Sequence, residues 1–476
     1  MPDKTEELFE NMPISKALMK LALPTVLGQI VLVVYNMADT FFIGLTESNV
    51  MITAVTICMP AFMFMSAIAN LFGVGASSVI SRALGKSYPD RARAACAFSF
   101  WFCALTAAFY SLFVKVCIHG FVDFLGGTNT SVFVYASKYL EYTVIYAGVF
   151  TTLNTLFSHL LRSEGHALHA GLGVVLGGVL NIVLDPLFMF RILEPGNEVV
   201  GAAVATALSN IISFLYYVAV VVVLNKKKLS IFSSKLTKES FSKRVPYCIF
   251  QAGIPACIMT FAENISYAIL DRLMSFNGLI AQAGVGVAKK VNMLAHSIVR
   301  GITQGALPLL GYSYSSGNRK KTKQTVKVTL AFAVGAASFC MMMNFIFARP
   351  LTRVFLTEAN NALSYGITFL KIFSIGCPFS ACAYTFISFF QAVGHGKESF
   401  LLALLRKGIL DIPMMFVLKD ILVVYGIVMA TPITDIVCCV VSIILFIVFA
   451  KKHLSKNKNR KVYNKETGTY DIIETC

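Results

Sequence analysis

Two acidic residues lie inside stretches of the chain that are otherwise almost entirely apolar. Asp39 belongs to NMADTFFIG at residues 36–44, which closes an apolar run that begins near Ala17. Asp185 belongs to a second such stretch, LNIVLDPLF. A carboxylate in the middle of a membrane costs roughly 2.5 to 3.5 kcal/mol on insertion scales, so an acid at that depth generally faces other protein or a watery cavity. Both acids are therefore candidate functional residues.

Polar side chains accompany the two acids in the first half of the chain. These candidate partners are Tyr35, Asn36, Asn154, Asn181 and Thr206. Residues three or four apart share a helical face, which places Tyr35 and Asn36 beside Asp39, and Asn181 beside Asp185. At 1.5 Å per residue, the two acids lie about 33 Å and 25 Å along their helices, in the outer half of the membrane. We expect one polar pocket there.

Such a pocket predicts exchange of a small cation. Desolvation and a second carboxylate favour the protonated form of an acid, whereas a bound cation favours the ionised form. Two acids with amide and hydroxyl oxygens can thus hold either H⁺ or Na⁺, with Asp39, Asp185 and Asn181 as the sodium ligands. The alternative is that buried Lys or Arg side chains neutralise the acids. The deep parts of this half contain no basic residue, which favours the ion site.

The composition identifies the kind of protein that holds these residues. The 476-residue chain is 57% hydrophobic and only 14% charged, which is too apolar for one ordinary soluble domain. Twelve apolar segments are each long enough to span a bilayer, so we predict an all-α polytopic membrane protein with twelve transmembrane helices. We expect no cofactor besides the coupling ion, and a monomer.

The basic residues are distributed unevenly between alternate loops. Of the Lys and Arg residues outside the spans, 28 fall on one side and six on the other. The positive-inside rule places the richer side, with both termini, in the cytoplasm. The run Lys226–Lys228 and the basic tail would lie along the anionic inner leaflet. This distribution explains the net charge of +17 without a role in nucleic-acid binding.

The chain also repeats itself at a period of about 225 to 231 residues. LALPTVLGQ at 21–29 resembles AGIPACIMT at 252–260, and RSEGHALHAG resembles QAVGHGKESF, while Ala205-Thr206 corresponds to Ala430-Thr431. Each half has six spans, so we expect two bundles related by a pseudo-two-fold axis along the membrane normal. The predicted divisions are an N-terminal bundle, a cytoplasmic linker, a C-terminal bundle and a basic tail, at 1–224, 225–244, 245–450 and 451–476.

The second half carries a different polar pattern. Glu263, with Asn264 beside it, lies deep in an apolar span, where it could attract an organic cation. Alternatively it pairs with the basic stripe of the next span, which contains Lys289, His296 and Arg300. Asp411, close to Arg406 and Lys407, is expected to form a local ion pair. Asp435 receives no assignment.

Taken together, these motifs resemble the bacterial multidrug and toxic compound extrusion (MATE) family, in its MepA-like branch. The resemblance rests on the helix 1 sequence LALPTVLGQIVLVVYNMADTFFIG, RALGKSYPDRARAA, LRSEGHALHAG, LNIVLDPLF and GAAVATALSN, and extends over essentially the whole chain. It implies a V-shaped pair of bundles that exports organic cations from the cell in exchange for H⁺ or Na⁺, and hence a role in antibiotic resistance. The family's coupling residues fall on the N-terminal cluster named above, and the helix 7 acid of one branch matches Glu263. That branch also has a helix 10 acid, which is missing from SIGCPFSACAYTFISFFQ, so we place ion coupling in the N-terminal half.

Other functional classes fit less well. A lipid-linked saccharide flippase of the same superfamily would need several basic residues for a pyrophosphate group. In this sequence they are largely confined to the predicted span 281–310. A membrane enzyme is disfavoured because the chain has no HExxH, GxSxG or P-loop motif. A channel requires neither duplicated halves nor a titratable pair of acids.

Overall fold

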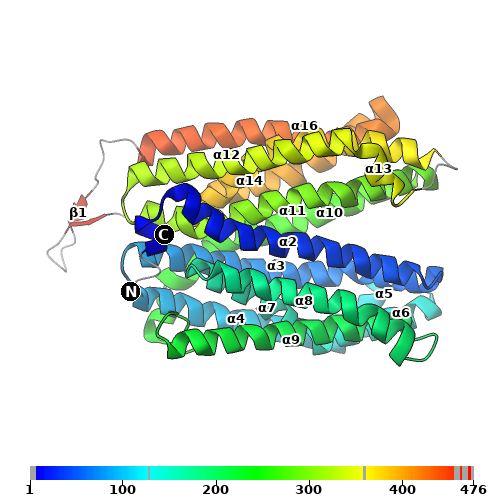
Figure 1. Cartoon of the computed structure of the whole chain (residues 1–476), viewed down its shortest axis with the longest axis horizontal. Helices are drawn as coiled ribbons and strands as arrows, with labels where there is room; N and C mark the ends of the chain where they lie inside the picture. The colour runs from blue at the N-terminus through cyan, green and yellow to red at the C-terminus, as the bar shows by residue number, and fades with distance from the viewer. Residues whose placement is uncertain (1–6, 127–128, 357–360, 455–460, 464–469, 473–476) are drawn as a thin grey trace.

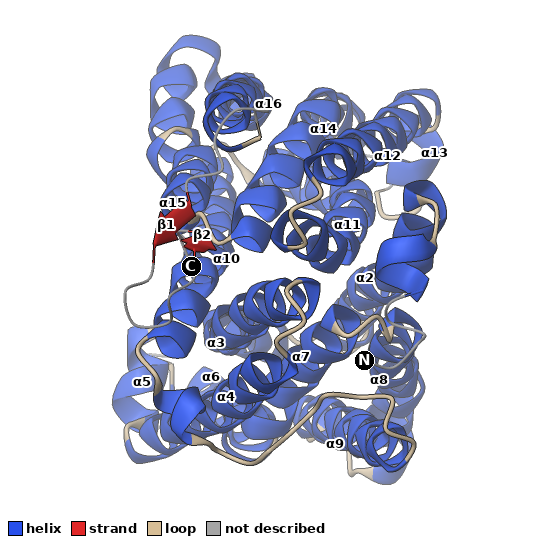
Figure 2. Ribbon diagram, turned by 90° about the vertical axis from the view of Figure 1, so that its left-hand side faces the viewer, coloured by secondary structure: helices blue, strands red, loops and turns tan. Residues whose placement is uncertain are grey.

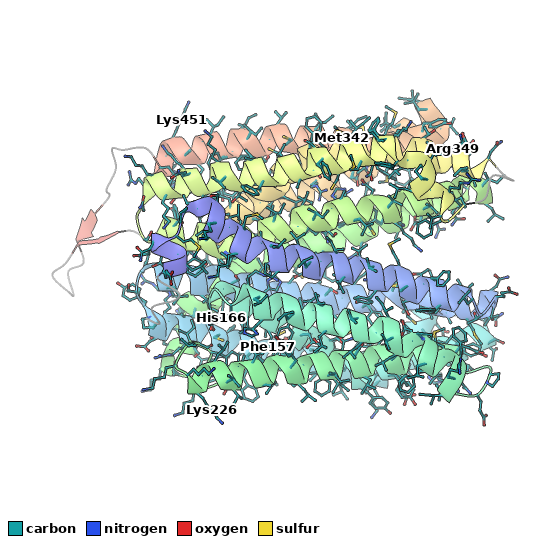
Figure 3. All side chains as sticks on the ribbon, in the orientation of Figure 1. Phe157, His166, Lys226, Met342, Arg349 and Lys451 are labelled. Atoms are coloured by element: carbon teal, nitrogen blue, oxygen red, sulfur yellow. The ribbon has the colours of Figure 1, made fainter. Side chains whose placement is uncertain are left out.

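The chain folds into long helices that run roughly side by side, as the computed structural model shows (Figure 1). The structure describes residues 7–126, 129–356, 361–454, 461–463 and 470–472. We call the end of the bundle at which Ile14, Lys226 and His453 lie the near end, and the opposite end the far end. In Figure 3 the labelled Lys226 and Lys451 mark the near end, and Arg349 marks the far end.

The described residues of the first half form eight α-helices and three short π-helical turns. In order they are η1 (Glu7–Asn11), α2 (Ile14–Gly44), α3 (Asn49–Gly85), α4 (Pro89–Val116), α5 (Ile118–Phe124), α6 (Thr130–Leu140), η2 (Glu141–Tyr146), α7 (Gly148–Ser163), α8 (Ala167–Leu187), η3 (Phe188–Ile192) and α9 (Glu198–Lys226).

The second half follows a connecting segment that contains the short helix η4 (Lys238–Phe241). Its elements are α10 (Arg244–Ser275), α11 (Leu279–Ser315), α12 (Arg319–Ile346), α13 (Ala348–Arg353), α14 (Ala362–Val393), α15 (Gly396–Leu404), η5 (Leu405–Ile409) and α16 (Asp411–His453). In the tail, β1 (Lys461–Tyr463) pairs antiparallel with β2 (Tyr470–Ile472). The fold is otherwise helical.

Length and apolarity identify nine membrane spans in the described part of the chain, or ten if a bent pair is counted as one span. One member of that pair is α6 together with η2, and the other is α7. The two members meet at an angle of 50°. Two features account for the remaining expected spans. The polar helix α11 is long enough to span a bilayer but is not among the apolar spans, and the 58-residue stretch Gly396–His453 reverses direction within α16.

The reversal in α16 occurs at Val423, whose backbone leaves the helical region (φ 51°, ψ −121°). Beyond it, Gly426 lies so close to Leu418 that a Cβ at position 426 would collide with the Leu418 carbonyl oxygen. In a continuous helix, residues eight apart would be separated by about 12 Å. The chain therefore folds back here, and α16 contributes to two spans.

The repeat recurs in the backbone conformation of equivalent loops. Gly165, which follows α7, has φ of 92°, and Gly394, which follows α14, has φ of 78°. Both glycines precede a histidine in the matched motifs RSEGH and QAVGH. Left-handed backbone conformation of this kind strongly favours glycine after a helix. The two halves thus use the same turn at the same point of the repeat.

The two halves pack together toward the near end. Figure 2, which looks onto that end, shows α10 to α16 grouped apart from α3, α4 and α6 to α9, with α2 between α8 and α11. Helix α3 packs on α10, and α2 packs on α11. Gly253 permits one of these approaches, because a Cβ there would collide with the Leu71 carbonyl oxygen. Ser78 further joins the halves by donating a hydrogen bond to the carbonyl of Gln391 at 2.5 Å.

The contacts between the halves stop near the middle of the bundle. Among the described residues, the interactions farthest toward the far end are the hydrogen bond from Asn70 to Thr260, at 3.0 Å, and the ring contact of Phe64 with Phe261. Figure 1 shows the ribbons of the two halves diverging beyond this point. The near end is therefore the closed end of this conformation.

Candidate functional site

The close packing of α2 on α8 brings the two acids of the first half together. Three glycines lie along this contact, and at Gly178 a Cβ would press against Val31 and the ring of Tyr35. The small residue therefore lets α2 settle onto α8 at this level. Asp39 and Asp185, both buried, lie within electrostatic range of each other. The structure thus brings together the pair that the sequence placed at similar depths.

Asn181 links Asp185 to the next helix. Its Nδ2 donates to Asp185 Oδ1 at 3.1 Å and to Thr206 Oγ1, on α9, at 3.2 Å. This amide uses both of its hydrogens and leaves its own oxygen facing inward. The three residues, all expected in one cluster, are in direct contact.

Asn154 joins the same network through a residue that the sequence reasoning missed. Its Nδ2 donates to the backbone carbonyl of Asn210 at 2.9 Å and to Asn210 Oδ1 at 3.1 Å. Asn210 in turn donates from Nδ2 to the Thr206 carbonyl at 2.9 Å. A continuous path of polar contacts therefore runs from Asp185 to Asn154. The position of Asn210, four residues after Thr206, was the signal that could have revealed it.

Tyr139 is a second missed member of the cluster. It lies at the end of α6, is buried, and is within electrostatic range of Asp39, Asp185 and Tyr35. Helical spacing could not reveal Tyr139, because it lies on a different helix from either acid. The described span begins at Thr130, because α6 and α7 form one bent crossing rather than a short straight one.

Asn36 departs from the expected arrangement. Its side chain is exposed, and its Nδ2 donates to the Leu32 carbonyl of the same helix at 2.6 Å. The rotation of α2 that buries Asp39 turns the adjacent face of the helix outward. Tyr35, by contrast, lies against α8.

Four buried oxygens of this cluster have no hydrogen-bond partner among the described residues. They are Asp39 Oδ1, Asp185 Oδ2, Asn181 Oδ1 and Asn154 Oδ1. A buried polar atom without a partner costs about 1 to 3 kcal/mol, so such a group in a native protein calls for an explanation. All four atoms are acceptors, and a proton or a hard cation with oxygen ligands would satisfy them.

The second half handles its deep acid differently. Glu263, on α10, forms an ion pair with Arg300, on α11, whose side chain is one-third exposed. Tyr384, on α14, donates to Glu263 Oε1 at 3.3 Å, and its hydroxyl also accepts from Arg300 Nη2 at 3.1 Å. Of the two roles left open for Glu263, the structure displays the pairing. The neighbouring Asn264 donates to the carbonyl of Thr260 at 2.8 Å.

Two further ion pairs are fully buried in this half. Lys407 Nζ donates to Asp411 Oδ2 at 2.8 Å, which is the expected local pair. Arg406 Nε donates to Asp435 Oδ1, on α16, also at 2.8 Å. Arg406 and Lys407 lie in the π-helical turn η5, where both adjacent side chains point inward. The partner of Asp435 was missed because it lies 29 residues away in the sequence.

Comparison with known proteins gives this fold a family. A family model described as MatE matches residues 24–187 and, a second time, residues 255–417. The chain belongs to the MATE family. The two matches begin at Pro24 and Pro255, which are the residues aligned by the internal repeat, so the duplication is confirmed. The family membership also confirms the all-α polytopic membrane fold.

Individual relatives match the MATE chain over nearly its full length. Multidrug export protein MepA of Staphylococcus aureus (strain MRSA252) is 26% identical over 94% of this chain and 96% of its own. The protein of the same name from Staphylococcus saprophyticus is 26% identical with the same coverage.

Solved structures support the fold of the MATE chain. An outward-facing MATE family transporter matches with a TM-score of 0.84 at 23% identity, over 94% of this chain and 99% of that one. A MOP superfamily transporter from Pyrococcus furiosus, described as having a binding pocket of reverse polarity, matches with a TM-score of 0.83 at 22% identity, over 94% of this chain and 98% of that one.

Proposed function

We propose that this MATE protein is a secondary active multidrug efflux transporter that exports organic cations in exchange for H⁺ or Na⁺. The observation that carries the proposal is the acid pair Asp39 and Asp185. Both acids are buried, and four oxygens of their cluster have no hydrogen-bond partner among the described residues. Neither acid has a Lys or Arg partner among the described residues. The MepA relatives are multidrug export proteins, which supports multidrug export as the task.

The coupling step follows from the charge of this site. Two carboxylates withdrawn from water repel each other, so the site gains stability when it takes up one positive charge. H⁺ would bind one carboxyl group, whereas Na⁺ would use Asp39, Asp185 and Asn181 as ligands. The oxygens of Asn154 and Thr206, on two further helices, lie in the same polar network and extend it across the bundle.

Ion uptake can be linked to the relative position of the halves. In this conformation the halves pack at the near end, and among the described residues the ring contact and hydrogen bond between them that lie farthest from that end are Phe64 with Phe261 and Asn70 with Thr260. Alternating access requires that this near-end contact open while the far end closes. Pro24 in α2 and Pro186 in α8 each remove a helix hydrogen bond, so both acid-bearing helices have a point at which to bend.

The substrate site belongs between the halves, where we place Glu263 and Asn264. Because Glu263 is paired with Arg300, an organic cation reaches it by displacing that guanidinium. The exposed third of the Arg300 side chain makes the exchange sterically feasible. The flippase alternative gains no support, since the buried basic residues Lys407 and Arg406 are each neutralised by an acid.

The direction of transport depends on the orientation in the membrane. The excess of Lys and Arg at the near end supports an orientation in which that end, with both termini, faces the cytoplasm of a bacterial cell. The far end would then face outward. At an assumed membrane potential of about 150 mV, one inward charge supplies roughly 3.5 kcal/mol, enough for about a 300-fold gradient of a neutral substrate. Exchange of one H⁺ for one monovalent cation is electroneutral and draws only on the ion gradient.

The proposal is tested with purified protein in proteoliposomes loaded with a fluorescent organic cation. An H⁺ gradient and a Na⁺ gradient are imposed separately, and efflux is followed in each case. We expect one of the two gradients to drive export. Absence of export under both would contradict the antiport, and export of lipid-linked saccharides instead would favour the flippase.

A further inference from the structure

The internal repeat relates the N-terminal ion site to a specific place in the second half. Asp411 follows Asp185 by 226 residues, and Thr431 follows Thr206 by 225. Each aspartate is followed by a proline within two residues. The first match of the MatE family model includes Asp185, and its second match includes Asp411. Asp411 is therefore the counterpart of Asp185.

At the counterpart of Asn181, four residues before the aspartate, the second half has Lys407. Asn181 donates from Nδ2 to the Asp185 carboxylate at 3.1 Å, and Lys407 donates from Nζ to the Asp411 carboxylate at 2.8 Å. The direction and the helical spacing of the two contacts are the same. The difference is that the donor in the second half carries a positive charge.

The remaining counterparts follow the same pattern. Ser266, on α10, occupies the repeat position of Tyr35 and donates to Asp411 Oδ2 at 2.5 Å. Leu270 occupies the position of Asp39 and is buried, so the second half has one acid where the first has two. Asp411 Oδ1 and Thr431 Oγ1 are buried without a hydrogen-bond partner among the described residues.

We propose that the second half contains the repeat counterpart of the ion site, and that the Lys407 ammonium permanently occupies it as a tethered cation. Without that ammonium, Asp411, Ser266 and Thr431 form a site for a monovalent cation such as Na⁺. A buried carboxylate needs one positive partner, which Lys407 supplies to Asp411 and which solution supplies to Asp185. The inference rests on the proposed function, because it takes the N-terminal cluster to be an ion site.

This arrangement explains why the two halves couple to ions differently. A lysine that is covalently attached cannot be exported, so the second site cannot exchange its charge during a transport cycle. Each of the two equivalent sites then holds one positive charge. The duplicated site thus stabilises the second half, while its exchangeable counterpart drives the first.

The decisive variant is Lys407→Asn, which gives the second half the residue found at Asn181. It is introduced into full-length Asp39→Asn/Asp185→Asn protein, so that the N-terminal site cannot contribute. Binding of ²²Na⁺ to the purified protein is measured between pH 6 and 9. We expect saturable binding that the parent variant lacks, at a ratio of about one ion per chain. Addition of Asp411→Asn should remove it.

A matched control is Lys289→Asn in the same background. Lys289 also lies over the ring of Tyr267, as Lys407 does, at 5.6 Å and 5.3 Å from the ring centroid. Its acid partner Asp271 is exposed, however, so water can replace the ammonium. No sodium binding is expected from this control. Folded Lys407→Asn protein without saturable sodium binding, or equal binding by the control, would overturn the proposal.

The converse variant keeps the test decisive if Lys407→Asn does not fold. Asn181→Lys in the otherwise unmodified chain places an ammonium within reach of Asp185, and we expect it to abolish ion-driven export while the protein still inserts. Asp185→Asn is measured alongside it. If Asp185→Asn is inactive and Asn181→Lys transports normally, the tethered-cation proposal fails. If both transport normally, the proposed function of the N-terminal site itself fails.

Discussion

The two halves of this protein share a fold but treat buried charge in opposite ways. In the first half, Asp39 and Asp185 lie among amide, hydroxyl and phenol groups, with no basic partner among the described residues. In the second half, Glu263, Asp411 and Asp435 each pair with a Lys or Arg. An internally neutral cluster holds helices together, whereas an acid pair without a counterion takes its counterion from solution. Under the proposed function, duplication has produced one structural cluster and one site that exchanges an ion.

The largest effect is expected from neutralising the N-terminal acids. Asp39→Asn and Asp185→Asn should each reduce ion-driven efflux to the level of empty proteoliposomes, because the site can no longer exchange a positive ion. The control is Asp90→Asn, which changes an exposed acid paired with Arg93. Undiminished efflux by both N-terminal variants would refute this site.

A second prediction concerns stability and separates the halves directly. Asp435→Asn leaves Arg406 buried without its charged partner and should lower the free energy of unfolding by about 3 to 5 kcal/mol. Asp39→Asn removes a buried charge that has no partner and should leave stability unchanged or raised. Arg93→Ala, at an exposed pair, should cost no more than about 1 kcal/mol.

These free energies are measured by denaturant titration of the purified protein. A double-mutant cycle with Arg406→Met and Asp435→Asn isolates the coupling between the two partners. If Asp435→Asn and Asp39→Asn lower the free energy of unfolding equally, the proposed distinction between a neutral cluster and an ion site is contradicted.

A third difference lies at the near end, in the equivalent loops after α7 and α14. Glu164 precedes Gly165, whereas Val393 precedes Gly394. Glu164 is buried and accepts hydrogen bonds from the Ser230 hydroxyl at 2.6 Å and the Ile231 N–H at 3.3 Å. Burial raises the pKa of Glu164 from 4.5 to about 7, although these two hydrogen bonds act in the opposite direction.

The raised pKa predicts a dependence of stability on pH. Between pH 4.5 and 7 the folded protein holds a proton that the unfolded chain releases, so stability falls as the pH rises through this window. The loss amounts to at most about 3 kcal/mol. Glu164→Gln should flatten this slope in thermal unfolding curves, and Glu47→Gln, at an exposed acid, should not. An unchanged slope in Glu164→Gln would contradict the prediction.

The smallest effect is expected at the substrate site. Arg300→Ala frees Glu263 from its ion pair and should tighten binding of an organic cation roughly tenfold, which corresponds to about 1.4 kcal/mol. Glu263→Gln should weaken the same binding. Both are measured by fluorescence titration with the transported dye. If Arg300→Ala lowers stability without any change in affinity, the pair serves only to hold α10 against α11.

Much of this architecture could be predicted before the structure was known. The acids at positions 39 and 185, their near-equal depth and the presence of Asn181 and Thr206 follow from spacing along helices. The local pair of Lys407 with Asp411 also follows from a four-residue interval. By contrast, Tyr139 was missed, because its span is formed by two helical segments that meet at an angle rather than by one straight helix. Asn36 was misjudged because side chains one position apart on a helix differ by about 100° in direction, and packing decides which of them is buried.

The apolar spans, the duplication and the depths of Asp39 and Asp185 follow from the sequence alone. These properties depend only on the order of residues and the rise of a helix, so no tertiary information is required. Which charges neutralise each other, as in the pairs of Arg300 with Glu263 and Arg406 with Asp435, depends on how the helices pack. Such partners lie on different turns or helices, and their contact depends on helix rotation and close packing. In the first half, Asp39 and Asp185 have no basic partner among the described residues, and this difference is the basis of the ion site that we propose.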